Sequence, residues 1–177
     1  MRVLAICGSL RASSTNRSAL EAAAMLAPAG MAMALYEGLA HLPHFNSDLD
    51  TAEPPDAVLT LRREIGLADG LVISSPEYAH GVPGSLKNAL DWLVASFEFP
   101  GKPVMLINAS PRAVHADQQL REILGTMSAR LIGGSSVVLP LLGRNLTASD
   151  IASDPELSRI LRTALADFEK AIRNGAS

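Results

Sequence analysis

Residues 7–18 read Cys-Gly-Ser-Leu-Arg-Ala-Ser-Ser-Thr-Asn-Arg-Ser and form a polar loop between two regular segments. The apolar run at residues 3–6 predicts a buried strand before the loop, and the alanine-rich residues 19–26 predict a helix after it. When a strand leads through such a loop into a helix, the loop N–H groups and the positive end of the helix converge on one point. The stretch therefore predicts an anion site, and its hydroxyl groups favour a phosphate.

The composition of the loop narrows the type of phosphate. Gly8 is its only glycine, so the loop matches neither the dinucleotide-binding G-x-G-x-x-G motif nor a P-loop, which needs G-K-[ST]. Many hydroxyl groups together with the Arg11 guanidinium suit a terminal phosphate monoester held by hydrogen bonds. The alternative interpretation is that the polar side chains only cap the helix. A cap accounts for one or two of them, which is fewer than the loop contains.

The composition of the whole chain excludes several classes of protein. The 177 residues are 48% hydrophobic and 19% charged, which excludes a disordered chain and fits one domain over residues 1–177. The net charge of −3 without a basic run predicts no nucleic-acid partner. The chain starts at a core strand and lacks a membrane-length apolar run, so we expect a cytoplasmic protein with no signal peptide and no membrane contact. Cys7 is expected to be a buried structural thiol, and the scattered histidines predict no metal site.

Strand and helix patterns alternate along the chain. Near-continuous apolar strands separated by helices predict a parallel sheet covered on both faces, in the five-stranded doubly wound form with strand order 2-1-3-4-5. In this form ligands bind at the carboxyl ends of strands 1 and 3, where the loops after residues 7 and 74 begin. The expected strands are residues 2–7, 31–36, 71–73, 104–107 and 136–139. The expected helices are residues 14–28, 56–68, 83–96, 117–129 and 155–174.

The loop after residue 74 is the second informative stretch. It reads Ser74-Ser75-Pro76-Glu77-Tyr78-Ala79-His80-Gly81-Val82-Pro83-Gly84-Ser85-Leu86-Lys87-Asn88-Ala89-Leu90-Asp91-Trp92. Its prolines and glycines predict a stiff loop that a flat ring can approach closely. With Gly8-Ser9-Leu10-Arg11, Ser14 and Asn16, this stretch resembles the NADPH-dependent FMN reductase family, which is flavodoxin-like and includes quinone, chromate and azo-dye reductases. The resemblance covers the whole chain.

The resemblance implies an FMN-dependent NAD(P)H oxidoreductase that reduces flavin, quinone or a related small electron acceptor. NADPH or NADH would supply the electrons, and the flavin would carry the chemistry, so that no catalytic residue is required. The residues implied for the FMN phosphate are Ser9, Arg11, Ser14, Thr15 and Asn16. The residues implied for the flavin ring are Pro76, Glu77, Tyr78 and Gly81, and the third loop, Ala109-Ser110-Pro111-Arg112, adds Ser110.

Two departures from the family pattern affect the ring side of the expected site. Many members carry Asn after the Tyr, where this chain has Ala79-His80, and the third loop departs from the usual glycine-rich form followed by R-A-Q. Without the family, Glu77 reads as a solvated loop residue, His80 as a surface histidine, and Asn88 as a surface residue of a helix. Two other function classes stay open: a flavodoxin-like electron carrier and a flavin-binding regulator.

The apolar content and the aromatic residues predict self-association. Trp92, Phe97 and Phe99 lie close together in the sequence, and the long connection of residues 42–56 has no obvious role within one chain. A monomer would leave such a patch in water, which is uncommon. We therefore expect a homodimer or a homotetramer with these aromatic residues at the interface.

Overall fold

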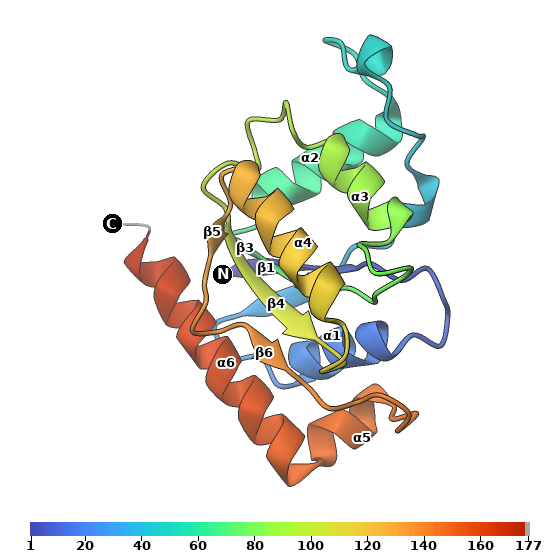
Figure 1. Cartoon of the computed structure of the whole chain (residues 1–177). Coiled ribbons are helices and arrows are strands. Elements are labelled where there is room, and N and C mark those ends of the chain that lie inside the picture. The colour runs from blue at the N-terminus through green and yellow to red at the C-terminus, as the bar shows by residue number, and fades with distance from the viewer. Residues whose placement is uncertain (176–177) are drawn as a thin grey trace.

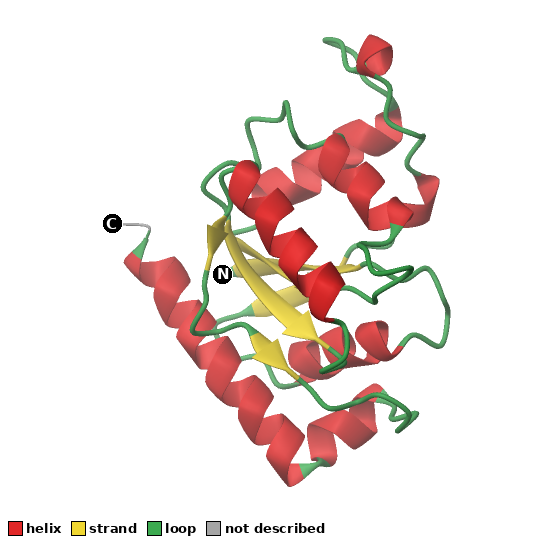
Figure 2. Cartoon of the chain, viewed as in Figure 1, coloured by secondary structure: helices red, strands yellow, loops and turns green. Residues whose placement is uncertain are grey.

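The computed structural model describes residues 1–175, and it shows a parallel sheet between two layers of helices (Figures 1 and 2). The last two residues of the expected domain, 176 and 177, lie outside the described residues. The strand order is β2-β1-β3-β4-β5, and β6 also pairs with β4. This confirms the predicted doubly wound, flavodoxin-like sheet. The strands are β1 (Arg2–Cys7), β2 (Ala32–Leu35), β3 (Gly70–Ser74), β4 (Pro103–Asn108), β5 (Arg130–Leu131) and β6 (Val137–Val138).

Each face of the sheet is covered by its own set of helices, as Figure 1 shows. On β1, Val3 and Ala5 belong to one core, whereas Leu4 and Ile6 belong to the other. Burial on both faces explains why the strands are continuous apolar runs rather than alternating ones. The first core is covered by α1 (Thr15–Met25), α5 (Ala148–Ser153) and α6 (Pro155–Asn174), and the second by α2 (Asp56–Leu67), α3 (Gly84–Asp91) and α4 (Val114–Thr126).

The prediction of a single last strand at residues 136–139 is wrong in detail. The edge position beside β4 is shared by two short strands, β5 and β6, which pair with successive parts of β4. Turns around Gly133 and Gly134 separate them. Within the break the Ser136 side chain takes the role of a backbone carbonyl, because its Oγ accepts from the Leu106 N–H at 3.1 Å. The ladder of hydrogen bonds therefore continues although the strand does not.

Two helical predictions also need correction, and one short helix was missed. The helix expected at residues 83–96 ends at Asp91, and turns follow it from residue 92. The helix expected from Asp117 begins three residues earlier, at Val114. The short helix α5 was not predicted; it begins with a capping box in which Thr147 and Asp150 satisfy each other's backbone N–H groups.

The long connection after β2 contains the short 3₁₀ helices η1 (Leu39–His41) and η2 (Ser47–Leu49). Part of it, coloured cyan in Figure 1, projects beyond α2 and α3. Its near end is held on α3, since the Pro43 carbonyl accepts from Trp92 Nε1 at 2.8 Å and from Asn88 Nδ2 at 2.9 Å. Asn88, expected as a surface residue, is therefore a tether for this loop. None of the helices in residues 1–175 has the length and apolar character that a membrane crossing needs.

Candidate functional site

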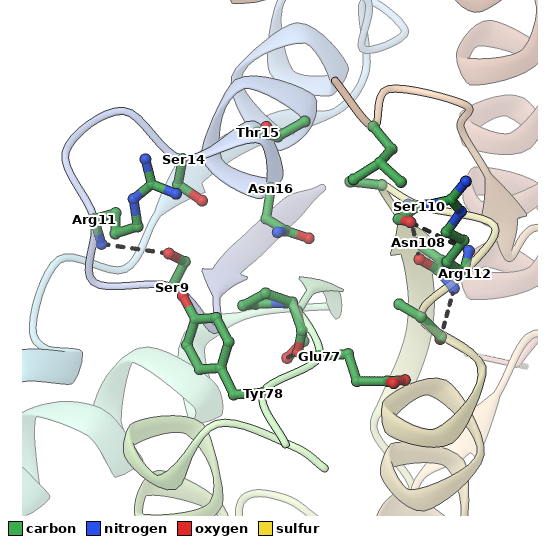
Figure 3. Close-up of a pocket in the computed structure, with 15 residues that line it drawn as sticks. Ser9, Arg11, Ser14, Thr15, Asn16, Glu77, Tyr78, Asn108, Ser110 and Arg112 are labelled. Carbon is green, nitrogen blue, oxygen red and sulfur yellow. Dashed lines mark hydrogen bonds between the residues drawn. The ribbon is translucent and has the colours of Figure 1, made fainter. Parts of the chain in front are cut away.

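A cavity of about 460 Å³ opens at the carboxyl ends of β1, β3 and β4 (Figure 3). Three loops line most of it, and each leaves one of these neighbouring strands. This is the position at which doubly wound sheets bind ligands. The lining residues are Ser9, Arg11, Ser14, Thr15 and Asn16 from the β1–α1 loop and helix start, Ser75, Pro76, Glu77 and Tyr78 after β3, Asn108, Ala109, Ser110, Arg112 and Ala113 after β4, and Leu142 after β6.

All the residues that the sequence predicts for the site line this cavity except Gly81. Gly81 follows Tyr78 by three residues in the same loop and lies outside the cavity lining. The prediction did not name six lining residues, of which Ala109 and Arg112 belong to the third loop that it assigned to the flavin side. Ser75, Asn108 and Ala113 flank the predicted segments, so extending each loop back to its strand and on to its helix would have found them. Leu142 comes from a loop after β6, and nothing in the sequence marks it.

The start of α1 holds several hydrogen-bond donors that no other described group uses. Ser14 is the helix N-cap, and its Oγ accepts from the Arg17 N–H at 3.4 Å. Within residues 1–175, the backbone N–H groups of Thr15 and Asn16 donate to no other group. A helix start with free N–H groups attracts anions. Capping and anion binding are therefore compatible at Ser14.

The two arginines of this region differ in what they contact. Arg17 is committed to carboxylates, because its guanidinium donates to both oxygens of Glu37 at 2.9 and 2.6 Å and to Glu21 at 2.8 Å. This pairing holds the pKa of Glu37 below its usual range. Arg11 is exposed and forms no ion pair with a carboxylate among residues 1–175. Arg11 is therefore the guanidinium of this loop that remains available to an anion.

Beneath the loop, polar contacts fix Asn16 and Cys7. Asn16 is 8% exposed, and its Oδ1 accepts from Ser74 Oγ at 2.9 Å, which leaves its Nδ2 group to face the cavity. Cys7 Sγ donates to the Ser9 carbonyl at 3.4 Å. Burial raises the pKa of the Cys7 thiol, so the group stays protonated at neutral pH and supports the loop.

The loop after β3 forms a tight hairpin turn at its tip. Tyr78 and Gly81 exchange both backbone hydrogen bonds, at 3.1 and 3.0 Å, around Ala79 and His80. Both central residues have left-handed backbone, with φ of 49° and 58°. Such a turn places Tyr78, which is 50% exposed, at the rim of the cavity. Asn and Gly favour these positions, so this chain forms the turn with a less suited pair of residues.

This geometry predicts that Ala79→Asn stabilises the protein. Left-handed backbone costs a residue such as Ala about 1 kcal/mol, and Asn tolerates it better. We expect the melting temperature to rise by about 2–4 °C, the shift that 1 kcal/mol gives in a domain of this size. A thermal melt followed by circular dichroism measures it. As the control, Ala79→Val should melt below the wild type, and an Ala79→Asn variant that also melts lower would contradict the interpretation.

Glu77 has a contact that neither sequence interpretation anticipates. Its Oε2 accepts from the Ala116 N–H at 2.9 Å, in the first turn of α4. The residue before that helix, Ala113, offers no side-chain cap. A carboxylate from another loop therefore satisfies one free N–H at the start of the helix, where negative charge is favourable. This contact gives a physical reason why α4 begins before Asp117, where the sequence predicted its start.

The loop after β4 is closed by its own hydrogen bonds. Asn108 Oδ1 accepts from the Ser110 N–H at 3.0 Å, and Asn108 Nδ2 donates to the Ala113 carbonyl at 3.1 Å. The Arg112 N–H donates to Ser110 Oγ at 3.2 Å (Figure 3). Ser110 and Arg112 are thus presented at the cavity by a rigid turn. Across residues 1–175 there is no group of three or more side chains suited to hold a metal ion.

Comparison with known proteins gives consistent matches. The family model described as NADPH-dependent FMN reductase matches residues 1–141. An NAD(P)H-dependent FMN reductase of Pseudomonas aeruginosa is 30% identical over 98% of this chain and 96% of its own length. A quinone reductase of Escherichia coli K12 is 35% identical over 75% of this chain and 73% of its own length.

Solved structures agree with these matches. The NAD(P)H:acceptor oxidoreductase FerB of Paracoccus denitrificans, a flavoenzyme, superposes with a TM-score of 0.86 at 26% identity, covering 98% of both chains. An archaeal flavodoxin is 12% identical and superposes with a TM-score of 0.63 over 98% of this chain and 99% of that one. The second likeness supports the fold alone.

Proposed function

The chain belongs to the NADPH-dependent FMN reductase family, and from this premise we propose that the cavity at the ends of β1, β3 and β4 is its FMN site. The protein is an NAD(P)H-dependent oxidoreductase with FMN as its cofactor, and it passes electrons to flavin, quinone or a related small acceptor. One observation carries the placement of the site. Arg11, which forms no ion pair within residues 1–175, lies beside the free N–H groups at the start of α1, in the cavity that the other loops complete.

The residues present fit an FMN molecule at both ends of the cavity. On the phosphate side, Arg11 would pair with the phosphate, and the N–H groups of Thr15 and Asn16 would donate to its oxygens. Asn16 Nδ2 would add a side-chain donor there, and Ser9, Ser14 and Thr15 would add hydroxyl groups. No carboxylate belongs to this set of donors. A carboxylate there would repel the negative charge of the phosphate.

On the ring side, Pro76 and Tyr78 would contact the flavin, and Ser110 would contact it from the loop after β4. When bound, FMN supplies the transfer of a hydride from the nicotinamide and of electrons to the acceptor. The chain's own part is to hold the cofactor, exclude water from its protected side and leave one face open. Tyr78 and Arg112, both exposed at the rim, would meet the nicotinamide or the acceptor first.

A spectroscopic titration tests this function. Protein loaded with FMN should lose the absorbance of oxidised flavin when NADPH is added without oxygen, and recover it when a quinone follows. Bleaching by NADPH would separate the enzyme from an electron carrier, which depends on a partner protein for its electrons. Bound FMN that NADPH and NADH both fail to reduce would contradict the proposed function.

We also propose that the protein is a homodimer or homotetramer, with Phe97 at the interface. Phe97 is 98% exposed and Val94 is 65% exposed, and they lie just after α3. Phe97 also borders a groove of about 590 Å³ between the projecting connection and α2. The expectation that Trp92 and Phe99 share this interface is wrong, because they are 0% and 1% exposed within the chain.

We expect Phe97→Asp to shift the protein towards a single-chain mass of 18.6 kDa without unfolding it. A fully exposed side chain contributes little to the fold, whereas a charge in an apolar interface opposes association. Light scattering coupled to size exclusion measures the mass. Met25→Asp, an exposed apolar position on α1, is the control and should leave the mass unchanged. An active wild type at 18.6 kDa would contradict the proposal.

A further inference from the structure

The ring-side loop, residues 75–83 between β3 and α3, is fastened to α4 at three points. Glu77 Oε2 accepts from the Ala116 N–H at 2.9 Å. The rings of His80 and His115 stack with centroids 4.4 Å apart and an interplanar angle of 19°. Gln119 Oε1 accepts from the Val82 N–H at 2.7 Å. These contacts join a loop at the mouth of the cavity to the helix beside it.

The two hydrogen bonds run in opposite directions between loop and helix. In the first bond the Glu77 side chain of the loop accepts from a backbone N–H of α4. In the second bond the Gln119 side chain of α4 accepts from a backbone N–H of the loop. Each bond satisfies a backbone group that has no partner in regular structure. Because each bond uses one backbone group and one side chain, the pair fixes both the position and the orientation of the loop on α4.

The stacked imidazoles lie at the tip of the loop. The left-handed backbone of Ala79 and His80 turns the chain so that the His80 ring meets His115 in the first turn of α4. Gly81 is close to the same helix, since a Cβ there would lie 3.2 Å from Gln119 Oε1. The contacts extend along α4 over residues 115–119, and one face of the loop therefore follows the helix.

The residues of α4 that make these contacts lie outside the cavity, whereas part of the loop that they hold lines it. His115 and Gln119 do not line the cavity, but Pro76 and Tyr78 do. A binding loop that is ordered before its ligand arrives loses less conformational entropy on binding. We propose that Glu77, Gln119 and the His80–His115 pair form a clasp that positions Pro76 and Tyr78 for the flavin ring. This proposal rests on the proposed function and names Gln119 as a positioning residue.

Gln119→Leu tests the clasp, because it removes the acceptor for Val82 and keeps a side chain of similar size. Both FMN and riboflavin should bind about three- to tenfold more weakly, the effect of losing one hydrogen bond. The two losses should be equal, since the clasp acts on the ring and not on the phosphate. Amide exchange in the protein without flavin should accelerate at Val82 and the hairpin turn, while the urea midpoint stays close to that of the wild type.

Variants at two positions provide rescue and controls. Gln119→Glu keeps an oxygen for the Val82 N–H and should retain the wild-type affinities. Gln118→Leu and Gln118→Glu alter the neighbouring exposed residue and should change nothing. Glu77→Gln, which keeps its acceptor oxygen, should bind flavin better than Glu77→Leu. Equal losses in the two Glu77 variants would show that its charge matters and its contact with α4 does not, which contradicts its role in the clasp.

The outcomes separate this proposal from the proposed function. A wild type that binds neither FMN nor riboflavin contradicts the proposed function itself. A wild type that binds both, together with a Gln119→Leu variant that binds them equally well, contradicts the clasp alone. A Gln119→Leu variant that loses affinity with exchange accelerated throughout the chain also contradicts it, because the residue would then support the fold in general.

Discussion

Trp92→Ala should lower the free energy of unfolding by about 3–5 kcal/mol, the usual cost of truncating a buried tryptophan to alanine. Trp92 is fully buried, and its ring meets Phe45 edge to face at 5.1 Å between centroids. Its Nε1 donates to the Pro43 carbonyl at 2.8 Å, and its own carbonyl accepts from Arg62 at 2.7 Å. The indole thus joins α3 to the long connection after β2, and its loss should affect both.

Urea unfolding followed by far-ultraviolet circular dichroism measures this change. Trp92→Phe is the matched control, because it keeps an aromatic ring and removes the N–H donor. We expect it to cost about 1–2 kcal/mol, since the Pro43 carbonyl still accepts from Asn88. If Trp92→Ala were as stable as the wild type and only dissociated into monomers, the side chain would belong to an interface and not to the core.

Arg11→Ala should weaken FMN binding about ten- to a hundredfold and leave riboflavin binding nearly unchanged. A hydrogen bond to a charged group contributes about 1.5–3 kcal/mol, and riboflavin lacks the phosphate that would receive it. Arg11 makes no ion pair with another described residue, so removing its guanidinium disrupts no internal salt bridge. Its backbone N–H, which donates to Ser9 Oγ at 3.3 Å, is retained in the variant.

Calorimetric titration of the flavin-free protein with both ligands measures the two affinities. Arg11→Lys should fall between the wild type and Arg11→Ala, because lysine keeps the charge and loses the planar fork of donors. Arg159→Ala, at an exposed position on α6, is the control and should bind both ligands as the wild type does. Equal losses for FMN and riboflavin in Arg11→Ala would contradict the phosphate role.

The fold was predictable because its signals are local in the sequence. The apolar run of β1, the polar loop that follows it and the helix of α1 are contiguous, and each follows from backbone physics over a few residues. Burial on both faces of a parallel sheet leaves continuous apolar runs, which fixed the alternation of strands and helices. The same order brings the loops after β1 and β3 to one edge, so the location of the cavity also followed from the sequence.

What the sequence did not reveal depends on contacts between distant segments. Glu77 pairs with Ala116 and Asn88 with Pro43, across 39 and 45 residues, and neither partner carries a local signal of the contact. Leu142 reaches the cavity because β6 ends beside β4. The buried Trp92 and exposed Phe97 look alike as aromatic residues in the sequence, and only the path of the chain after α3 ends at Asp91 buries one and exposes the other. By itself, then, the sequence determined the sheet, the polar loop between β1 and α1, and the family, because local patterns specify them. The tertiary structure decided how the ring-side loop is held and which apolar residues reach the surface, because those depend on which side chains the folded chain brings together.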